Sequence, residues 1–252
     1  MTRISIVTVT YNAAATLPSC LLSVAQQGVD VEHLVIDGGS TDGTLAILEQ
    51  ARADGSIRYI SEPDEGIYDA MNKGLRMASG DIVGILNADD FYASPDVLAE
   101  VSEVFADKSL DSCYGDLVYV DRDDTAKVKR YWRAGAFDRQ AFYHGWMPPH
   151  PTFFVRRSVY ERHGVFSLRL GSAADYELML RLLLRQGIST QYIPKLLVKM
   201  RVGGESNASI KNRLRANRMD RRAWAVNGLQ PHFWTLWAKP LRKMGQFIAT
   251  GE

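Results

Sequence analysis

Residues 4 to 86 alternate between two kinds of segment, and this alternation constrains the fold more than any other feature of the sequence. Short runs rich in β-branched residues favour strands at 4–9, 33–36, 57–60 and 81–86. Between them, apolar residues recur at helical spacing over 16–25, 44–53 and 67–77. Strands that alternate with helices are joined by right-handed crossovers into a parallel sheet with helices on both faces. We therefore predict an α/β fold built on a mostly parallel sheet flanked by helices.

The second half of the chain is less regular. The expected elements there are strands at 112–119, 126–132 and 152–155, the first two antiparallel, and helices at 94–105 and 175–186. From residue 210 the chain becomes basic and helical. We expect one domain over 1–208, with a ligand-binding half (1–92) and a second half (93–208), and a helical C-terminal extension over 209–252.

Composition narrows the class of protein. The chain has 252 residues, of which 46% are hydrophobic, enough for one large core. A formal net charge of +1 is not that of a nucleic-acid-binding protein. The first apolar run is too short for a secretion signal, and no stretch approaches the roughly 20 apolar residues of a membrane-spanning helix. We expect a cytoplasmic protein whose two cysteines, Cys20 and Cys113, are ordinary thiols.

Polar or acidic residues follow each of the four N-terminal strands. These segments are 10–12, 37–43, 62–66 and 87–90. Any one of them could be a plain turn, but in a parallel sheet all four would meet at the carboxyl edge, where ligands bind. Carboxylates that are brought together repel one another unless a cation compensates. A hard divalent cation that carries phosphates would supply this compensation.

These segments and two later ones resemble the family 2 inverting glycosyltransferases, which have the GT-A (Rossmann-like) fold. The resemblance rests on residues 8–12, 37–44, 64–74, 80–90, 149–154 and 174–178, and it covers roughly residues 3 to 205. The most similar branch makes O-antigen, colanic-acid-like and other exopolysaccharides. The resemblance implies a metal-dependent inverting transfer from a nucleotide-sugar, expected to be a UDP-sugar, to a saccharide or polyprenyl-linked saccharide acceptor.

The resemblance implies a metal site after the fourth strand. Asp89 would bind the Mn²⁺ or Mg²⁺ that bridges the donor diphosphate, with Asp90 close by; a helix-capping turn is the alternative. Many relatives have aspartate where this chain has Asn87, which is expected to contact the ribose. Many also have an acid that reads the uracil edge where this chain has Gly38. The identity of the base therefore stays open.

The resemblance also implies the remaining donor contacts. The residues expected to bind the nucleotide-sugar are Thr8, Thr10, Tyr11, Asn12, Asp37, Asn72, Lys73, Asn87, Ala88, Asp89 and Arg201. For the residues at the end of the first strand, the alternative is packing against the sheet. Lys73 could equally be a solvated helix lysine. Arg201 begins a segment with two glycines that suits a lid over the donor, and a surface arginine is the alternative.

Asp175 is the predicted general base. It matches the acidic residue that opens the acceptor-side helix in the family. An inverting transfer needs a carboxylate to take the proton from the acceptor hydroxyl. Its position at a predicted helix start also suits an N-cap, and both roles are compatible. Glu177 is the second candidate and an expected acceptor contact.

Two residues of the aromatic loop before the predicted strand at 152–155 are further candidates. Trp146 offers an indole face on which a sugar could stack, and His150 lies in a Pro-His-Pro sequence that matches the family. Both are expected to contact the acceptor, with packing of the loop as the alternative for each.

The C-terminal extension combines basic and aromatic residues over 211–248. Such a pattern on helices favours peripheral contact with an anionic membrane, here the inner face of the cytoplasmic membrane. A solvated helix followed by a helix packed on the core is the alternative.

Two other functions also stay open for the protein. One is a nucleotidyltransferase, but the sequence lacks the glycine-rich phosphate loop that would support it. The other is a scaffold that has kept the fold without the chemistry.

Overall fold

The computed structural model describes residues 2–203 and 210–236, and the side chains of α8 from residue 217. The strands are β1 (Ile4–Thr10), β2 (Val31–Asp37), β3 (Arg58–Ser61), β4 (Ile82–Ile85), β5 (Asp90–Tyr92), β6 (Ser112–Val120), β7 (Val128–Trp132), β8 (Phe154–Arg156) and β9 (Thr190–Arg201). The α-helices are α1 (Leu17–Ala25), α2 (Thr44–Ala53), α3 (Ile67–Met77), α4 (Val97–Val104), α5 (Arg139–Tyr143), α6 (Arg157–His163), α7 (Ala174–Met179) and α8 (Ile210–Val226). The strand–helix alternation predicted for the N-terminal half is confirmed.

A single sheet runs through both predicted halves of the domain. Its strand order is β3-β2-β1-β4-β8-β6-β9-β5, with β7 paired to β6. The first four strands in this order are parallel, as predicted. β8 is antiparallel to both β4 and β6, and it joins the parallel part to the rest of the sheet. β6 and β7 form the predicted antiparallel pair.

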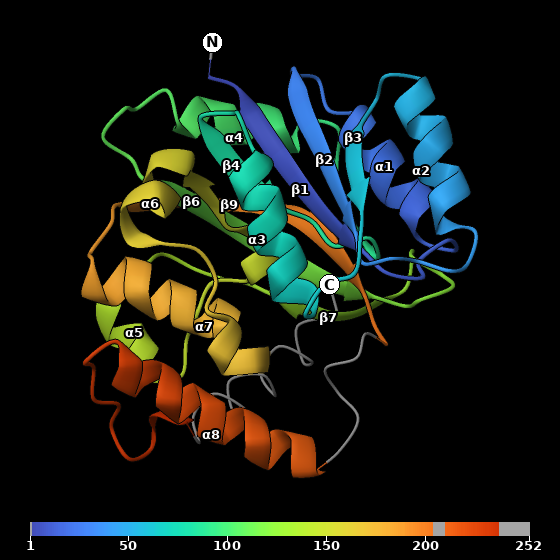
Figure 1. The fold of residues 1–252 in the computed structure, drawn as a ribbon. Helices are drawn as coiled ribbons and strands as arrows, with labels where there is room; N and C mark the ends of the chain where they lie inside the picture. The colour runs from blue at the N-terminus through green and yellow to red at the C-terminus, as the bar shows by residue number, and fades with distance from the viewer. Residues whose placement is uncertain (1, 204–209, 237–252) are drawn as a thin grey trace.

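Helices cover both faces of the sheet, and the alternation of side chains along β1 decides which helix packs where (Figure 1). Val7 and Val9 face α3 and lie in a core with Ala70 and Met71. Ile4 and Ile6 point to the other face, where α1 and α4 pack against them. α2 covers the outer strands on that same face. A strand buried on both faces reads as a continuous apolar run, which is what β1 shows.

α3 crosses β1 and β2 at very short range. A methyl group added at Gly74 would lie 2.2 Å from Val7 Cγ1 and 3.2 Å from Ile36 Cγ1. Only a glycine fits at this crossing, because any larger side chain would push the helix off the sheet. The close approach fixes the position of α3 on the sheet, and Tyr68 lies in the first turn of this helix.

The helix predicted at 175–186 differs from expectation in its second half. α7 ends at Met179, and a π-helical turn follows over Leu180–Arg185 before Gly187 takes a positive φ of 62°. A π-helical turn is wider than an α-helical one, so some main-chain carbonyls lose their usual α-helical hydrogen-bond partner. Arg139 meets two of them, donating to Leu183 O at 3.2 Å and Leu184 O at 2.6 Å. Arg139 belongs to α5, which is far from this turn in the sequence. The local periodicity of residues 175–186 therefore does not predict the π-helical turn.

The strand predicted at 152–155 is shorter and later than expected. His150–Thr152 forms a 3₁₀ turn, and β8 covers Phe154–Arg156. Pro151 has no N–H to give to a sheet, which disfavours a strand at this point. Thr152 Oγ1 holds the turn through hydrogen bonds with Gly115 O and Pro149 O, both 2.9 Å.

α8 packs on the domain through its second half. Trp224 is fully buried and donates its indole N–H to Tyr176 Oη at 2.9 Å. Asn227 donates to Glu177 Oε1 at 3.2 Å. α8 thus lies against the helix that carries Asp175 (Figure 1). Within the described ranges, no helix has the length and apolar character needed to cross a bilayer.

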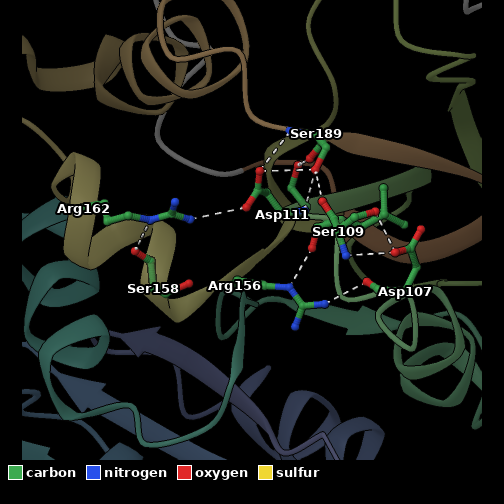
Figure 2. Close-up of polar contacts among 9 residues, drawn as sticks. Asp107, Ser109, Asp111, Arg156, Ser158, Arg162 and Ser189 are labelled. Atoms are coloured by element: carbon green, nitrogen blue, oxygen red, sulfur yellow. Dashed lines mark hydrogen bonds and ion pairs between the residues drawn. The ribbon is translucent and has the colours of Figure 1, made fainter.

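A polar network ties together the edge of the sheet opposite to the strand ends singled out by the sequence (Figure 2). Asp111 accepts hydrogen bonds from Ser189 N and Arg162 Nη2, at 3.1 and 3.4 Å. Arg156 donates to Leu110 O at 2.6 Å and to Asp107 O at 2.9 Å. These contacts join the starts of β6 and β9 to β8 and α6, so the network holds the scaffold and leaves the other edge for ligands.

Candidate active site

The four polar segments do lie at one edge of the sheet. Thr10, the last residue of β1, is in register with Asp37, and Asp37 is in register with Ser61. Ala88 donates to Val9 O at 3.2 Å, which brings the segment after β4 to the end of β1. This edge is the carboxyl end of the parallel strands, the usual ligand site of such sheets.

Asp37 organises the loop after β2. Its buried carboxylate accepts hydrogen bonds from Gly39 N at 3.1 Å, Ser40 N at 2.9 Å and Ser61 Oγ at 2.6 Å, and a further one from Ser40 Oγ. Main-chain and hydroxyl donors therefore surround both oxygens. The structure thus shows that the buried Asp37 shapes the loop, and its predicted contact with the nucleotide-sugar stays a prediction.

The loop after β1 is clamped to the loop after β2. Asn12 has a positive φ of 48°, a left-handed conformation that asparagine tolerates better than most residues. Its N–H donates to Ser40 Oγ, and its Oδ1 accepts from Thr41 N, both at 2.8 Å. The sharp turn leaves Tyr11 63% exposed at the sheet edge. Thr10 Oγ1 is buried beside it without a hydrogen-bond partner in the described part of the chain.

The acidic turn after β4 holds unpaired buried oxygens. Asp90 is fully buried, and Asn87 Nδ2 donates to its Oδ2 at 3.3 Å. Asn87 Oδ1 and Asp90 Oδ1 find no donor among the described residues. Burial first, and the neighbouring Asp89 carboxylate second, raise the pKa of Asp90 well above its usual range. Asp89 is half-buried, and no described side chain binds its carboxylate.

These groups fit a divalent cation that is shared with a ligand. Orphaned carboxylate and amide oxygens are the donors that Mg²⁺ and Mn²⁺ prefer. Over the residues described, no cluster of three or more His, Cys, Asp or Glu side chains could hold a metal alone. Asp89 and Asp90 would therefore supply part of a coordination shell, and phosphate oxygens and water the rest. Mg²⁺ is commonly bound in this way in phosphate-handling sites.

Arg201 closes one side of the acidic turn. Its guanidinium donates to Asp89 O at 2.7 Å and to Ser19 Oγ at 3.0 Å, and it lies 4.7 Å from the centre of the Phe91 ring. Arg201 thus anchors the end of β9 to the turn. The glycine-containing segment predicted as a lid extends into 204–209, outside the described residues.

Asp175 lies in the first turn of α7, where its Oδ1 accepts from Tyr176 N at 2.7 Å. Two groups from elsewhere in the chain face it. Burial, followed by the Asp175 carboxylate, raises the pKa of Tyr68. Burial lowers the pKa of His150, and Asp175 opposes that shift. The predicted base and the predicted acceptor residue His150 therefore share one site, which Tyr68 completes from the start of α3.

Tyr119 links this site to the acidic turn. Burial raises the pKa of its phenol, the Arg130 guanidinium lowers it, and the carboxylates of Asp90 and Asp175 both raise it. Arg130 is itself buried and lies 3.8 Å from the centre of the Tyr119 ring. Asp90 and Asp175 are thus close enough to act on the same group, with a buried cation between β6 and β7 beside it.

Three predicted donor contacts take structural positions in the described conformation. Thr8 is buried, and its Oγ1 lies 2.9 Å from His33 Nε2, which agrees with the alternative of packing against the sheet. The Asn72 amide donates to Phe166 O and accepts from Phe166 N, both at 2.9 Å, which uses its polar atoms. Lys73 binds Glu62 at 2.9 Å and Asp69 at 3.5 Å. Each has a packing or charge partner that the sequence alone does not identify.

Two predicted acceptor contacts also have protein partners. Trp146 is buried among aromatic rings, and its indole N–H donates to Ala134 O at 2.7 Å, which agrees with the alternative of loop packing. Glu177 is buried and forms an ion pair with Arg181 at 2.9 Å. Arg181 also donates to Val165 O at 2.7 Å. Through Arg181, Glu177 holds the loop before α7, and its predicted contact with the acceptor stays a prediction.

Sequence reasoning missed Tyr68, Tyr119 and Arg130. Tyr68 lies inside a segment that carries the family resemblance. Its place directly before Asp69 at a predicted helix start could have indicated that it lies near the ligand edge of the sheet. Tyr119 and Arg130 face each other across the β6–β7 pair, where they are in register. Only the pairing of the two strands shows that these side chains meet.

Comparison with known proteins decides the family. The family model described as glycosyl transferase family 2 matches residues 5–164, more than half of the chain. The chain belongs to this family. As a family 2 glycosyltransferase it is an enzyme, and the relationship predicted from the sequence motifs is confirmed.

Related sequences and structures agree with this assignment. A PGL/p-HBAD biosynthesis glycosyltransferase of Mycobacterium tuberculosis is 32% identical over 211 residues, which cover 82% of this chain and 80% of the relative. A chondroitin synthase of Escherichia coli is 29% identical over 181 residues, or 71% of this chain and 26% of the synthase.

Solved structures show the same fold. Staphylococcus aureus TarS, in complex with UDP-GlcNAc, is 19% identical with a TM-score of 0.74, covering 99% of this chain and 74% of that protein. The mannosyltransferase PcManGT of Pyrobaculum calidifontis, in complex with GDP-Man and Mn²⁺, is 21% identical with a TM-score of 0.65, covering 100% of this chain and 76% of that protein. At these identities the likeness concerns the fold, and the predicted GT-A fold is confirmed.

Proposed function

We propose that this glycosyltransferase is a metal-dependent inverting enzyme that moves a sugar from a nucleotide-sugar, in our expectation a UDP-sugar, to a saccharide or lipid-linked saccharide during the assembly of a surface polysaccharide or glycolipid. The observation that carries the proposal is the acidic turn after β4, where Asn87 Oδ1 and Asp90 Oδ1 are buried without a donor among the described residues. The turn lies at the carboxyl edge of the parallel strands, and these unpaired oxygens support a site for a cation that carries a diphosphate. The names of the relatives and the ligands of the two structural neighbours agree with it.

Each residue of the site has a defined task in this proposal. Asp89 and Asp90 hold the cation, which offsets the negative charge that develops on the departing nucleoside diphosphate. Asp175 accepts the proton of the acceptor hydroxyl as that oxygen attacks the anomeric carbon. The main-chain N–H of Tyr176 fixes one oxygen of Asp175. In this proposal the other oxygen accepts the proton.

The decisive experiment separates donor binding from transfer. Asp175→Asn should bind the donor with unchanged affinity and lose transfer by about 100-fold to 10,000-fold, because it removes general-base catalysis. Asp89→Ala should lose the Mn²⁺-dependent part of donor binding. Binding is measured by calorimetry with and without Mn²⁺, and transfer by release of the nucleoside diphosphate. Asp123→Asn, an exposed carboxylate of the β6–β7 turn, is the control.

The result that would contradict the proposal is equally specific. Full turnover by Asp175→Asn would remove that residue from the mechanism. A wild-type protein that binds no nucleotide-sugar in the presence of Mn²⁺ or Mg²⁺ would favour a scaffold that has kept the fold only.

We also propose that the C-terminal extension contacts an anionic membrane. Phe233 and Trp234 are 82% and 40% exposed, and three arginines of α8 are exposed as well: Arg218, Arg221 and Arg222. Exposed aromatic and basic side chains together are typical of interfacial anchors. The rest of the predicted segment, the side chains of 211–216 and all of 237–248, lies outside the described residues.

This contact can be tested without disturbing the fold. Replacing Phe233 and Trp234 by serine should reduce cosedimentation with vesicles that contain anionic phosphatidylglycerol and leave the melting temperature unchanged. Val128→Ser, which removes an exposed apolar side chain from β7, is the matched control. Equal sedimentation of both variants and wild type would refute the proposal.

A further inference from the structure

Side chains from the loops after β1 and β3 approach the backbone of Gly38, which lies in the loop after β2. A methyl group at Gly38 would lie 2.5 Å from Asp64 Oδ2 and 3.5 Å from Tyr11 Cδ2. The first distance is shorter than real Cβ contacts, so a side chain at residue 38 would force the Asp64 carboxylate to move. The carboxylate of Asp64, from the loop before α3, thus occupies the place where a side chain of residue 38 would stand.

Asp64 is held in a defined orientation. Its Oδ1 accepts a hydrogen bond from Gly66 N at 2.8 Å, in a turn where Gly66 has a positive φ of 111°. Among the described residues, nothing donates to Oδ2, which is the oxygen that faces Gly38. The side chain is half-buried. A fixed carboxylate oxygen that lacks a donor is a ready acceptor for an N–H group of a ligand.

An aromatic ring stands beside this oxygen. The ring of Tyr11 is exposed at the end of β1, and the clamped conformation of Asn12 keeps it there. Planar bases stack on such rings irrespective of their identity. The ring supplies a surface for a base, and the carboxylate supplies selectivity at the edge of that base.

The position suits the base of a nucleotide whose diphosphate lies at the acidic turn. Gly38 and Asp64 follow β2 and β3, and the acidic turn follows β4, on the other side of β1 in the sheet. We propose that Asp64 is the residue that selects the donor nucleobase, with Oδ2 accepting the ring N–H of a keto base that stacks on Tyr11. This inference rests on the proposed use of a nucleotide-sugar.

The chemistry of the bases makes the proposal specific. Uracil and guanine present a ring N–H on the edge that pairs with other bases. Cytosine and adenine present an unprotonated ring nitrogen at the same place, and its lone pair repels a carboxylate. Hydrogen bonds to a charged group contribute enough to separate the two classes by about 10-fold to 100-fold in affinity. We therefore expect UDP or GDP, and neither CDP nor ADP, to be preferred.

The experiment measures base selectivity on the full-length protein. The dissociation constants of UDP, GDP, CDP and ADP are determined by calorimetry with Mn²⁺ for the wild type, Asp64→Asn and Glu65→Gln. Asparagine keeps the size of Asp64 and adds an N–H donor. Asp64→Asn should weaken UDP or GDP by about 10-fold or more and leave CDP equal or tighter. Glu65→Gln changes the adjacent exposed carboxylate and should bind all four as the wild type does.

A selectivity ratio distinguishes recognition from simple loss of structure. Damage to the loop would weaken all four nucleotides alike, whereas loss of recognition changes the ratio of UDP or GDP to CDP. The relative affinity of UDP and GDP tells which keto base is used. An unchanged ratio in Asp64→Asn, or an equal weakening of all four nucleotides, would overturn the inference and leave the proposed function intact. If the wild type binds none of them, both fail together.

A double substitution adds an independent test. Gly38→Ala should weaken UDP or GDP binding in the wild type, because the new methyl group displaces Asp64 Oδ2. In the Asp64→Ala background the same change should add no further loss, since the clash has gone. Additive losses from the two substitutions would show that they act separately and would contradict the proposal.

Discussion

At the scale of single residues, His33 shows how a buried group couples stability to pH. It lies inside β2, its Nε2 is 2.9 Å from Thr8 Oγ1, and burial lowers its pKa from 6.5 to about 4. Between these two values the unfolded chain takes up a proton that the folded chain refuses. Stability is therefore lost as the pH falls from 6.5 toward 4, by about 3 kcal/mol from this residue.

The prediction is a difference between two proteins. His33→Gln keeps a hydrogen-bonding group near Thr8 and removes the titration. The fall in the free energy of unfolding between pH 6.5 and pH 4, measured by urea denaturation, should be about 3 kcal/mol smaller in the variant. Identical pH dependence of the two proteins would mean that His33 takes up its proton in the folded state.

At the scale of elements, the crossing of α3 over β1 depends on Gly74. Gly74→Ala would improve helix propensity but place a methyl group 2.2 Å from Val7 Cγ1. We expect overpacking to prevail and to destabilise the protein by about 1–3 kcal/mol. Gly28→Ala, where a methyl group would meet no atom within 4 Å, is the control and should be neutral in the same urea titration. Equal stability of the two variants would contradict this account.

Local patterns predicted the elements whose identity depends on their own residues. β1, β2 and α1–α3 follow from apolar periodicity, because each is buried on faces that the period marks. β5 was not predicted: it exists because Asp90 and Tyr92 pair with Met200 and Val198 of β9. The π-helical turn likewise depends on Arg139. Elements defined by a distant partner leave little trace in their own sequence.

The same division applies to the candidate site. The motifs identified Asp89, Asp90 and Asp175, whose residue types and family positions suit the proposed chemistry. They also predicted ligand contacts for Thr8 and Asn72, whose side chains bind protein groups in the described conformation. Whether a polar side chain faces a ligand or a main-chain partner is set by packing, which motifs do not record.

At the scale of the whole molecule, the C-terminal helix supports the acceptor side of the site. Trp224 is buried against Tyr176, the residue next to the predicted base, and Tyr143 packs on it with ring centres 4.9 Å apart. Trp224→Ala should cost about 3–5 kcal/mol of stability and should lower kcat at temperatures where the protein stays folded, by shifting Asp175.

The measurement pairs thermal unfolding with kinetics. The KM for the donor should change less than kcat, because the proposed donor residues follow β1 to β4 and Trp224 packs against α7. Val226→Ala alters an exposed residue of the same helix and should leave both quantities unchanged. A variant that loses stability and keeps full kcat would confine α8 to a role in folding.

The single sheet also has a practical meaning for redesign. In the proposed function, the donor and acceptor residues are attached to one frame, so the strand order sets their spacing and it does not have to be rebuilt when specificity is changed. Libraries that vary the loops after β1, β2 and β3 could exchange one nucleotide for another while the proton-accepting end stays in place. On this proposal, the donor site and the acceptor site can be redesigned separately.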